Sequence, residues 1–213
     1  MTMLAMTVLT LAPTAIAGTG GVVLRPGARV TARTIDGVGA GSCTAGFLAK
    51  NRRGHAVLFS AGHCGQGEGT WLTMAAETGG DVPVAEFVVT EFEGIAGEAT
   101  DIAVLKPAKG VDATGKIGGQ IPVSGSVSSI AEGDTLCKMG AVTGLDCGPV
   151  VSVSASKVKF AATVEHGDSG GPVFIMRKNG TAAAVGLIIR KSGDALPIAE
   201  LIGPWLDRWK LTV

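Results

Sequence analysis

The sequence lacks an excess of charge of either sign: Lys and Arg together number 18, and so do Asp and Glu, in a chain of 213 residues. It also lacks any long basic run, internal repeat or low-complexity linker. Without a net field or a basic run, a protein has little electrostatic means of recruiting nucleic acid or an anionic membrane surface. Composition therefore argues against a nucleic-acid-binding role.

Long helical periodicity is scarce as well. Instead, 33 glycines are interspersed with many short runs rich in Val, Ile and Phe, a pattern typical of an all-β chain with many turns. The length suits one large unit or two small, tightly joined ones. Strands are predicted at residues 44–49, 55–60, 84–91, 102–105, 150–154, 158–163, 172–177 and 182–189.

Two segments organise these strands. Residues 111–123, rich in Gly, are interpreted as the connection between two β halves. In PIAELIGPWLDRWKL, apolar residues at 198, 201, 202, 205, 206 and 209 predict an amphipathic helix that is bent near Gly203–Pro204. Trp205 and Trp209, at helical spacing, are expected to be core anchors.

The first 17 residues, MTMLAMTVLTLAPTAIA, carry no charge and end in Ala15-Ile16-Ala17, followed by Gly18. An apolar run with a small-x-small ending is typical of a secretory signal peptide, although a basic residue near the start is missing. The run is marginal as a membrane span, and a membrane anchor or a buried strand is the alternative. We expect cleavage after Ala17, a secreted or extracytoplasmic protein, and no membrane contact once the signal is removed.

The cysteines contain no CxxC motif and no zinc-like ligand set; they are Cys43, Cys64, Cys137 and Cys147. Four cysteines allow three disulfide connectivities, which the residues alone leave open. Disulfides in an oxidising compartment are the better interpretation, and they agree with export. No metal and no organic cofactor is expected.

A histidine stands where a general base could be held. His63 lies in LFSAGHCG, directly after an apolar run and beside Cys64, which can tether it. Imidazole titrates near neutral pH, so a histidine fixed at a strand end suits proton transfer. Taken alone, a surface histidine near a disulfide is the simpler interpretation. His55 is interpreted as a strand residue without a catalytic role.

An acid and a nucleophile complete a set with His63. Asp101, in GEATDIAVLKP, stands just ahead of an apolar run, and taken alone it is more simply a turn or strand-capping residue. Ser169 lies in TVEHGDSGGPVF, which taken alone could be an ordinary turn. One nucleophile, one base and one acid that fixes the tautomer are what acyl transfer needs. The combination predicts a Ser/His/Asp site.

The segments SAGHC, DIAVL and GDSGGP, in the order His, Asp, Ser, resemble the trypsin-like serine proteases, which have the chymotrypsin fold. LCKMGAVTGLDCG is similar to the cysteine-closed loop of their bacterial, streptogrisin-like branch, and the resemblance covers most of residues 40–190. It implies an all-β peptidase domain over residues 18–213, with two antiparallel six-stranded β-barrels packed together and a C-terminal helix. The N-terminal barrel would span about 18–115, and the C-terminal barrel with its helix about 120–213.

The resemblance also implies residue roles. Ser169 would be the nucleophile, His63 the general base and then acid, and Asp101 the residue that orients the imidazole. The backbone amides of Gly167 and Ser169 would form the oxyanion hole, which explains the small residues around the serine. The bridges would be Cys43–Cys64 and Cys137–Cys147.

Structural support for this site is expected from a buried pair of Asp168 and Lys138. In the animal enzymes the counterpart of Asp168 pairs with a new N-terminus made by activation cleavage, whereas the bacterial branch uses a basic side chain. Lys138 occupies that place, with a solvated loop lysine as the alternative.

Specificity is the least defined feature. Counting back from Ser169 puts Thr163 near the base of the S1 pocket, so an acidic pocket base that would select Lys or Arg is not expected. The usual small residues of the pocket wall are replaced in LIIRKSG by Ile189, Arg190 and Lys191. This basic wall, with His166 at the pocket mouth, favours small, apolar or acidic P1 residues, or else a narrow or closed pocket.

The predicted function is a secreted serine endopeptidase that acts on a protein or peptide substrate through a Ser169 acyl-enzyme, as an expected monomer. One alternative is a trypsin-fold binding protein, weak or silent in catalysis because its S1 pocket is occluded. Another is a self-limited processing protease that stays occupied by its own C-terminus.

Overall fold

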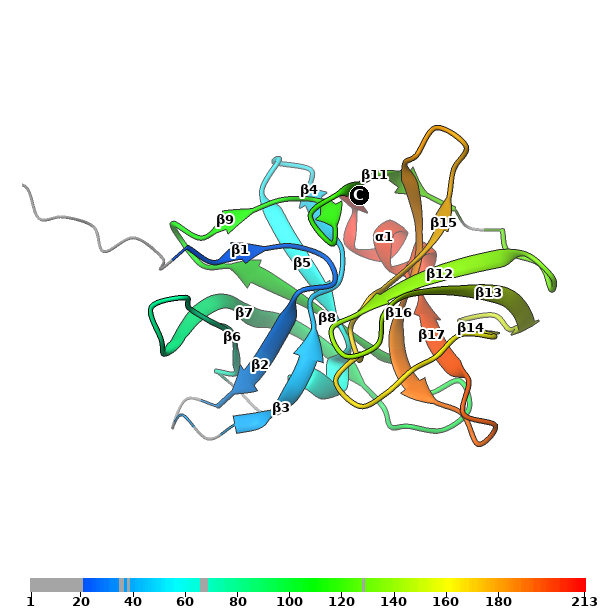
Figure 1. The fold of residues 1–213 in the computed structure, drawn as a ribbon, viewed down its shortest axis with the longest axis horizontal. Coiled ribbons are helices and arrows are strands. Elements are labelled where there is room, and N and C mark those ends of the chain that lie inside the picture. Colours follow the sequence, from blue (N-terminus) through cyan, green and yellow to red (C-terminus); the bar gives the residue numbers. More distant parts are fainter. Residues whose placement is uncertain (1–20, 35–36, 38, 66–68, 128) are drawn as a thin grey trace, which may run out of the picture.

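The computed structural model describes residues 21–34, 37, 39–65, 69–127 and 129–213 (Figure 1). The predicted signal peptide, its cleavage site and Gly18 lie outside the described residues. Within them, two large β-sheets lie side by side and a single α-helix packs between them (Figure 1). No helix among these residues is long and apolar enough to cross a membrane.

The first sheet closes through the chain itself. Its order is β18-β4-β5-β8-β7-β6-β2-β3, and β3 runs into β4 through only three residues, Ala45–Phe47, so the two ends of the sheet meet. The strands are β2 (Arg29–Arg33), β3 (Gly39–Thr44), β4 (Leu48–Asn51), β5 (Ala56–Ser60), β6 (Trp71–Ala75), β7 (Asp81–Phe92), β8 (Asp101–Pro107) and β18 (Leu211–Thr212).

The second sheet closes through hydrogen bonds. Its order is β10-β11-β16-β15-β12-β13-β14-β17, and a further pairing of β16 with β17 makes a closed six-stranded barrel. The strands are β10 (Lys116–Ile117), β11 (Ile121–Ser126), β12 (Thr135–Gly140), β13 (Gly144–Val153), β14 (Lys157–Phe160), β15 (Pro172–Met176), β16 (Ala182–Lys191) and β17 (Pro197–Leu201). The short strands β1 (Val23–Leu24) and β9 (Asp112–Ala113) pair separately. The predicted all-β, two-barrel fold is confirmed.

The predicted C-terminal helix is wrong in its first half. The segment PIAEL forms β17, and α1 begins at Gly203 and ends at Trp209. Pro204 lies in the first turn of α1, where its missing N–H costs no hydrogen bond, so it starts the helix instead of bending it. Trp205 is buried and stacks near Trp209, with 4.8 Å between the ring centroids, in keeping with their expected role as core anchors.

A shared core joins the two barrels. Phe47 and Phe59 from the first barrel pack in one cluster with Phe174 and Leu187 from the second and with Trp205 of α1. Each barrel also has its own apolar cluster. Because protein interiors are close-packed, residues carried by different barrels keep fixed positions across this interface.

Candidate active site

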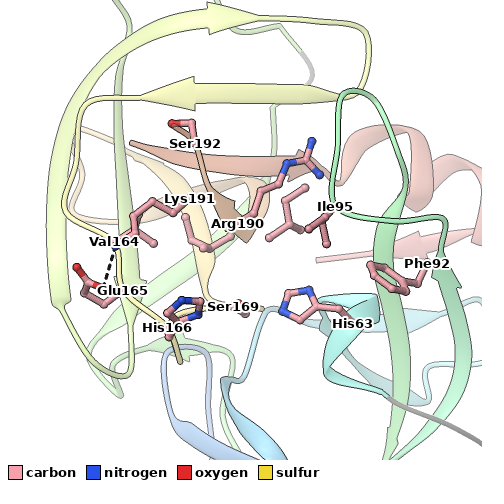
Figure 2. A pocket seen from close by; sticks show the side chains of 12 residues that line it. His63, Phe92, Ile95, Val164, Glu165, His166, Ser169, Arg190, Lys191 and Ser192 are labelled. Atoms are coloured by element: carbon pink, nitrogen blue, oxygen red, sulfur yellow. Dashed lines mark hydrogen bonds and ion pairs between the residues drawn. The ribbon is translucent and has the colours of Figure 1, made fainter. Parts of the chain in front are cut away.

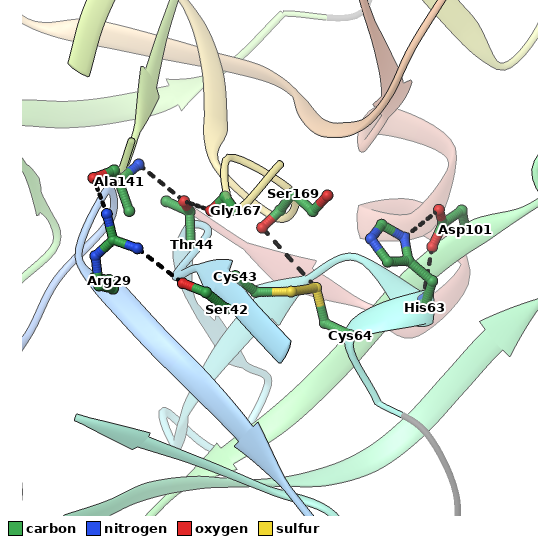
Figure 3. Close-up of a disulfide and its surroundings, with 10 residues drawn as sticks. All are labelled: Arg29, Ser42, Cys43, Thr44, His63, Cys64, Asp101, Ala141, Gly167 and Ser169. Carbon is green, nitrogen blue, oxygen red and sulfur yellow. Dashed lines mark hydrogen bonds and ion pairs between the residues drawn. A yellow bond between two sulfur atoms is a disulfide. The ribbon is translucent and has the colours of Figure 1, made fainter. Parts of the chain in front are cut away.

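His63 lies on a short 3-10 helix, Gly62–Cys64, that follows β5 at the interface of the barrels. The disulfide Cys43–Cys64 ties this helix to β3, as Figure 3 shows. A Cβ atom on residue 62 would lie 2.6 Å from the Glu91 carbonyl oxygen, so only glycine allows this close approach. Sequence and crosslink together hold the His63 ring at the edge of the first barrel.

Asp101 holds the His63 ring from behind. It is the first residue of β8, and its side chain is 1% exposed. Its Oδ1 accepts the His63 backbone N–H at 2.9 Å, and its Oδ2 lies 2.7 Å from Nδ1. A carboxylate can only accept, so the ring proton must be on Nδ1 and Nε2 is left with a free lone pair. That lone pair is what a general base needs.

Ser169 comes from the second barrel, in the loop between β14 and β15. Its carbonyl accepts the backbone N–H of Thr44 at 2.7 Å, and its side chain faces the same cavity as His63 (Figure 2). Among the hydrogen bonds of the described residues, none joins Ser169 Oγ to the imidazole. In unliganded sites such bonds are often long and tighten when substrate binds.

Two backbone amides beside Ser169 are free to bind an oxyanion. In this turn the amides of Asp168, Gly170 and Gly171 donate to Glu165, Ile188 and Asp168 carbonyls. The amides of Gly167 and Ser169 have no acceptor among the described residues. Gly167 has φ +101°, a region that L side chains rarely adopt, which explains why a glycine stands there.

Thr44 holds this turn, and the sequence offered no signal for it. Its buried hydroxyl donates to the Gly167 carbonyl at 2.7 Å and accepts the Ala141 N–H at 2.9 Å, as Figure 3 shows. A residue of the first barrel therefore fixes the serine loop of the second.

Asp168 is fully buried and heavily hydrogen-bonded. Its carboxylate accepts N–H groups from Val142, Thr143 and Glu165 at 2.9–3.2 Å and the Thr143 hydroxyl at 2.5 Å. Burial raises the pKa of Asp168, but these hydrogen bonds, Thr143 first, outweigh it and hold the pKa below its usual value.

Lys138 lies beside Asp168, as expected, but most of the contact between them is a hydrogen-bonded bridge through the Thr143 hydroxyl. Its Nζ is 3.9 Å from Asp168 Oδ2, and it donates directly to the Thr143 hydroxyl and to the Gly144 carbonyl. Neither side chain is exposed to solvent. Burial lowers the pKa of Lys138, and the neighbouring Asp168 and Asp146 partly offset this. Thr143 was not foreseen because a neutral hydroxyl carries no charge pattern.

A cavity of about 620 Å³ opens beside His63 and Ser169. Apolar side chains line much of it, and its polar rim carries most of the predicted specificity residues (Figure 2). The lining residues are His63, Phe92, Ile95, Val164, Glu165, His166, Ser169, Ile188, Ile189, Arg190, Lys191 and Ser192. Ile189, Arg190 and Lys191 line this cavity and do not fill it.

Thr163 does not line this cavity, contrary to its expected place at the pocket base. It is exposed, and its N–H donates to Asp146 Oδ2 at 2.7 Å, the main reason that the pKa of Asp146 lies below its usual value. The neighbouring Val164 and Glu165 line the cavity instead.

The cationic side chains of the cavity are only partly neutralised. Lys191 Nζ pairs with Glu165 Oε2 at 2.9 Å across the rim. Arg190 donates through Nη2 to the Gly97 carbonyl, while its buried Nη1 has no hydrogen-bond partner. A buried guanidinium donor without an acceptor is unfavourable.

The only group of close potential metal ligands among the described residues is Cys43, His63 and Cys64. Both sulfurs belong to one disulfide, and the thiolate form that binds metals is therefore absent. The second bridge, Cys137–Cys147, joins directly opposed residues of β12 and β13.

Comparisons with known proteins agree with this architecture. No family model matches the chain. It is similar to Serine protease 2 of Streptomyces fradiae, with 25% identity over 171 residues, covering 73% of this chain and 90% of the relative.

Solved structures agree as well. Nocardiopsis protease shares 26% identity with a TM-score of 0.64, over 89% of this chain and 98% of the other. Protease A of Thermobifida fusca shares 23% with a TM-score of 0.65, over 89% and 97%. A homologue of alpha-lytic protease shares 24% with a TM-score of 0.67, over 90% and 99%. Fold and relatives together identify the chain as a bacterial-type serine endopeptidase of the chymotrypsin fold.

Proposed function

We propose that this endopeptidase cleaves peptide bonds through an acyl-enzyme on Ser169. His63 Nε2 takes the proton of Ser169 Oγ as the oxygen attacks the scissile carbonyl, and later gives that proton to the leaving amine. Asp101 keeps the imidazole in the required tautomer and stabilises the imidazolium that forms. The observation that carries this proposal is the His63–Asp101 hydrogen bond beside Ser169, together with the amides of Gly167 and Ser169, which have no acceptor among the described residues.

The amides of Gly167 and Ser169 bind the negative oxygen of the tetrahedral intermediate. One such donor typically contributes about 3 kcal/mol to transition-state stabilisation. The buried group of Asp168, Thr143 and Lys138 supports these amides from beneath, so the turn is shaped without a newly made N-terminus to pair with Asp168.

Labelling with a fluorophosphonate, read by intact mass, tests this assignment. The wild type is expected to gain a single adduct on Ser169, and both Ser169→Ala and His63→Ala are expected to gain none. His55→Ala is the matched control, because His55 is exposed and lies outside the cavity. Undiminished labelling of folded His63→Ala would overturn the proposed mechanism and not the fold.

We further propose that the substrate carries an acidic side chain at or next to P1. Arg190, Lys191 and His166 give the cavity a surplus of basic groups over Glu165, its one acid. One structural relative, 22% identical with a TM-score of 0.68, is described as specific for glutamic acid and as using a histidine triad in substrate binding. Its sequence is too distant to carry the specificity across, so the proposal rests on the cations of this chain.

Matched fluorogenic peptides that differ only at P1 test the substrate class. The peptide with Glu at P1 is expected to be cleaved faster than the peptide with Gln. Both should be cleaved faster than the peptide with Lys, because Arg190 and Lys191 repel a cationic P1 side chain. Arg190→Gln should narrow the difference between Glu and Gln. Equal cleavage of Glu and Lys peptides would exclude an acid-selecting site while leaving the endopeptidase intact.

Two disulfides fit an extracellular protein. Cleavage after Ala17 is the corresponding proposal for maturation, and N-terminal sequencing of the secreted protein tests it.

A further inference from the structure

The carboxylate of Asp101 is anchored only to the residue that it orients. Among the described residues, its two oxygens accept hydrogen bonds from His63 alone. The side chain is therefore placed by His63, which the Cys43–Cys64 disulfide holds, and by the Asp101 backbone, which enters β8 directly from the segment 93–100.

Glu200 of β17 holds that backbone from the other barrel. Its Oε2 accepts the Asp101 N–H at 3.2 Å, and its Oε1 accepts the Trp205 indole N–H at 3.1 Å. The side chain is 1% exposed. The Asp101 N–H and the Trp205 indole N–H therefore donate to different oxygens of the buried Glu200 carboxyl group.

A carboxylate accepts at both of these positions, whereas an amide would turn its NH2 donor toward one of the two N–H groups. A buried carboxylate in turn needs a cation, because an isolated buried charge is strongly unfavourable.

Lys157 supplies that cation. It lies opposite Glu200 in the pairing of β14 with β17, is nearly buried, and its Nζ is 2.9 Å from Glu200 Oε2. Its other two hydrogen bonds go to Ser156 Oγ at 2.8 Å and to the Glu98 carbonyl at 3.2 Å. Glu98 belongs to the segment that leads into Asp101, so one ammonium group fixes both that segment and Glu200.

We propose that the buried pair Lys157–Glu200 is a positioning device for catalysis: it sets the place of Asp101 through its backbone amide and thereby aligns His63. This inference rests on the proposed role of Asp101. The pair joins the acid of the first barrel to two strands of the second, so relative movement of the barrels at this point would misalign the imidazole.

The double variant Lys157→Met/Glu200→Met tests this by removing both charges and the acceptor while keeping side-chain length. Replacing a whole buried ion pair by apolar residues is often neutral for stability, but the Asp101 and Trp205 N–H groups lose their acceptor. The variant should therefore fold with a lowered thermal midpoint, and its kinetics are measured well below that midpoint. Its kcat should fall about tenfold with KM unchanged, since small misplacements of a catalytic group cost this much or more. The low-field proton NMR signal of the His63–Asp101 hydrogen bond should shift or broaden.

Two single variants serve as controls. Trp205→Phe removes a donor to Glu200 but leaves its contact with Asp101, so kcat should stay near wild type even if stability falls. Lys159→Met removes a lysine from the same strand whose partner, Asp194, is exposed, and should change neither property.

A double variant with wild-type kcat and an unchanged NMR signal would overturn the inference, as would activity losses that simply follow stability across all variants. Asp101→Asn separates this failure from failure of the proposed mechanism. If Asp101→Asn retains full kcat, the assigned role of Asp101 is wrong. If it loses activity while the double variant does not, only the role of the pair is wrong.

Discussion

At the scale of single residues, the serine loop is held by two uncharged side chains as well as by the buried pair of Asp168 and Lys138. Thr44 and Thr143 each use one hydroxyl to join two loops. A hydroxyl both donates and accepts, so that of Thr44 bridges a carbonyl and an N–H, and that of Thr143 bridges the Lys138 ammonium and the Asp168 carboxylate. The serine loop thus depends on Thr44 and Thr143, two residues that belong to no recognisable sequence motif.

Replacement of Thr44 by Val should lower kcat about tenfold with little change in KM. The variant keeps the side-chain shape but leaves the Gly167 carbonyl and the Ala141 N–H unpaired. The amides of Gly167 and Ser169 should then lose part of their alignment. Loss of a whole oxyanion donor lowers kcat roughly 100-fold, and partial misalignment should lower it less. Steady-state kinetics on one peptide measures both constants. Thr44→Ser should restore most of the activity, and an inactive Ser variant would point to packing in place of the hydroxyl.

Asp168 should make stability fall in acid. Its pKa in the folded state lies below its ordinary value of 3.8, so its contribution is fully present above about pH 4 and is lost as the pH falls through the folded pKa. Urea unfolding of wild type and Asp168→Asn between pH 3 and 7, a range of about four units around the ordinary carboxyl pKa, measures this. The difference in unfolding free energy between wild type and Asp168→Asn should be constant near pH 7 and should shrink toward pH 3. A difference that stays the same over the whole pH range would contradict this prediction.

How much the sequence could predict is clearest at individual positions. His63, Asp101 and Ser169 stood out because each belongs to a short motif, and the structure places His63 and Ser169 at one cavity with Asp101 buried behind His63. Glu200 and Lys157 did not stand out, because they belong to no motif and nothing local shows that they face each other. Thr163 was misplaced because counting along a loop does not reveal where the loop turns.

At the scale of elements, β17 explains why the predicted C-terminal helix is wrong in its first half. It pairs with β14 on one side and β16 on the other, and three of its five residues are buried. Ala199 and Glu200 point to opposite faces of the strand and are both buried, so strict polar alternation is missing and the apolar residues merge with those of α1 into one helix-like pattern. Of the two pairing partners, β16 is the preceding strand in the chain, but β14 is distant in sequence.

The two disulfides should differ in what their removal changes. Cys43–Cys64 closes a separation of 21 residues and fixes the helix of His63, whereas Cys137–Cys147 closes 10 residues within one hairpin. Loop-closure entropy gives each about 3 kcal/mol. Paired Cys→Ala variants should therefore lose similar stability, but only the Cys43/Cys64 variant should also lose kcat. Comparing unfolding midpoints with kinetics measured well below them checks this; equal kcat in both variants would contradict it.

At the scale of the whole molecule, the site exists because the two barrels form one body. His63 and Asp101 come from the first and Ser169 from the second, so no barrel alone holds the set. A common core, the contact of Thr44 with the serine loop and the bond from Glu200 to Asp101 all cross the interface. The chain adds a fourth connection: after α1 it returns to the first barrel, where β18 pairs with β4.

Deletion of residues 211–213 tests how far the barrels depend on this return. Leu211 is buried, and losing it should cost about 2 kcal/mol of hydrophobic stabilisation in addition to the β18–β4 hydrogen bonds. Because the barrels share a core, unfolding should remain a single transition at a lower midpoint, with kcat preserved well below it. Thr212→Ala, which changes only an exposed side chain of the same strand, is the matched control and should unfold like wild type. Two separate transitions in the truncated chain would show that the barrels fold independently, and the geometry of the site would then depend on β18 as much as on the common core.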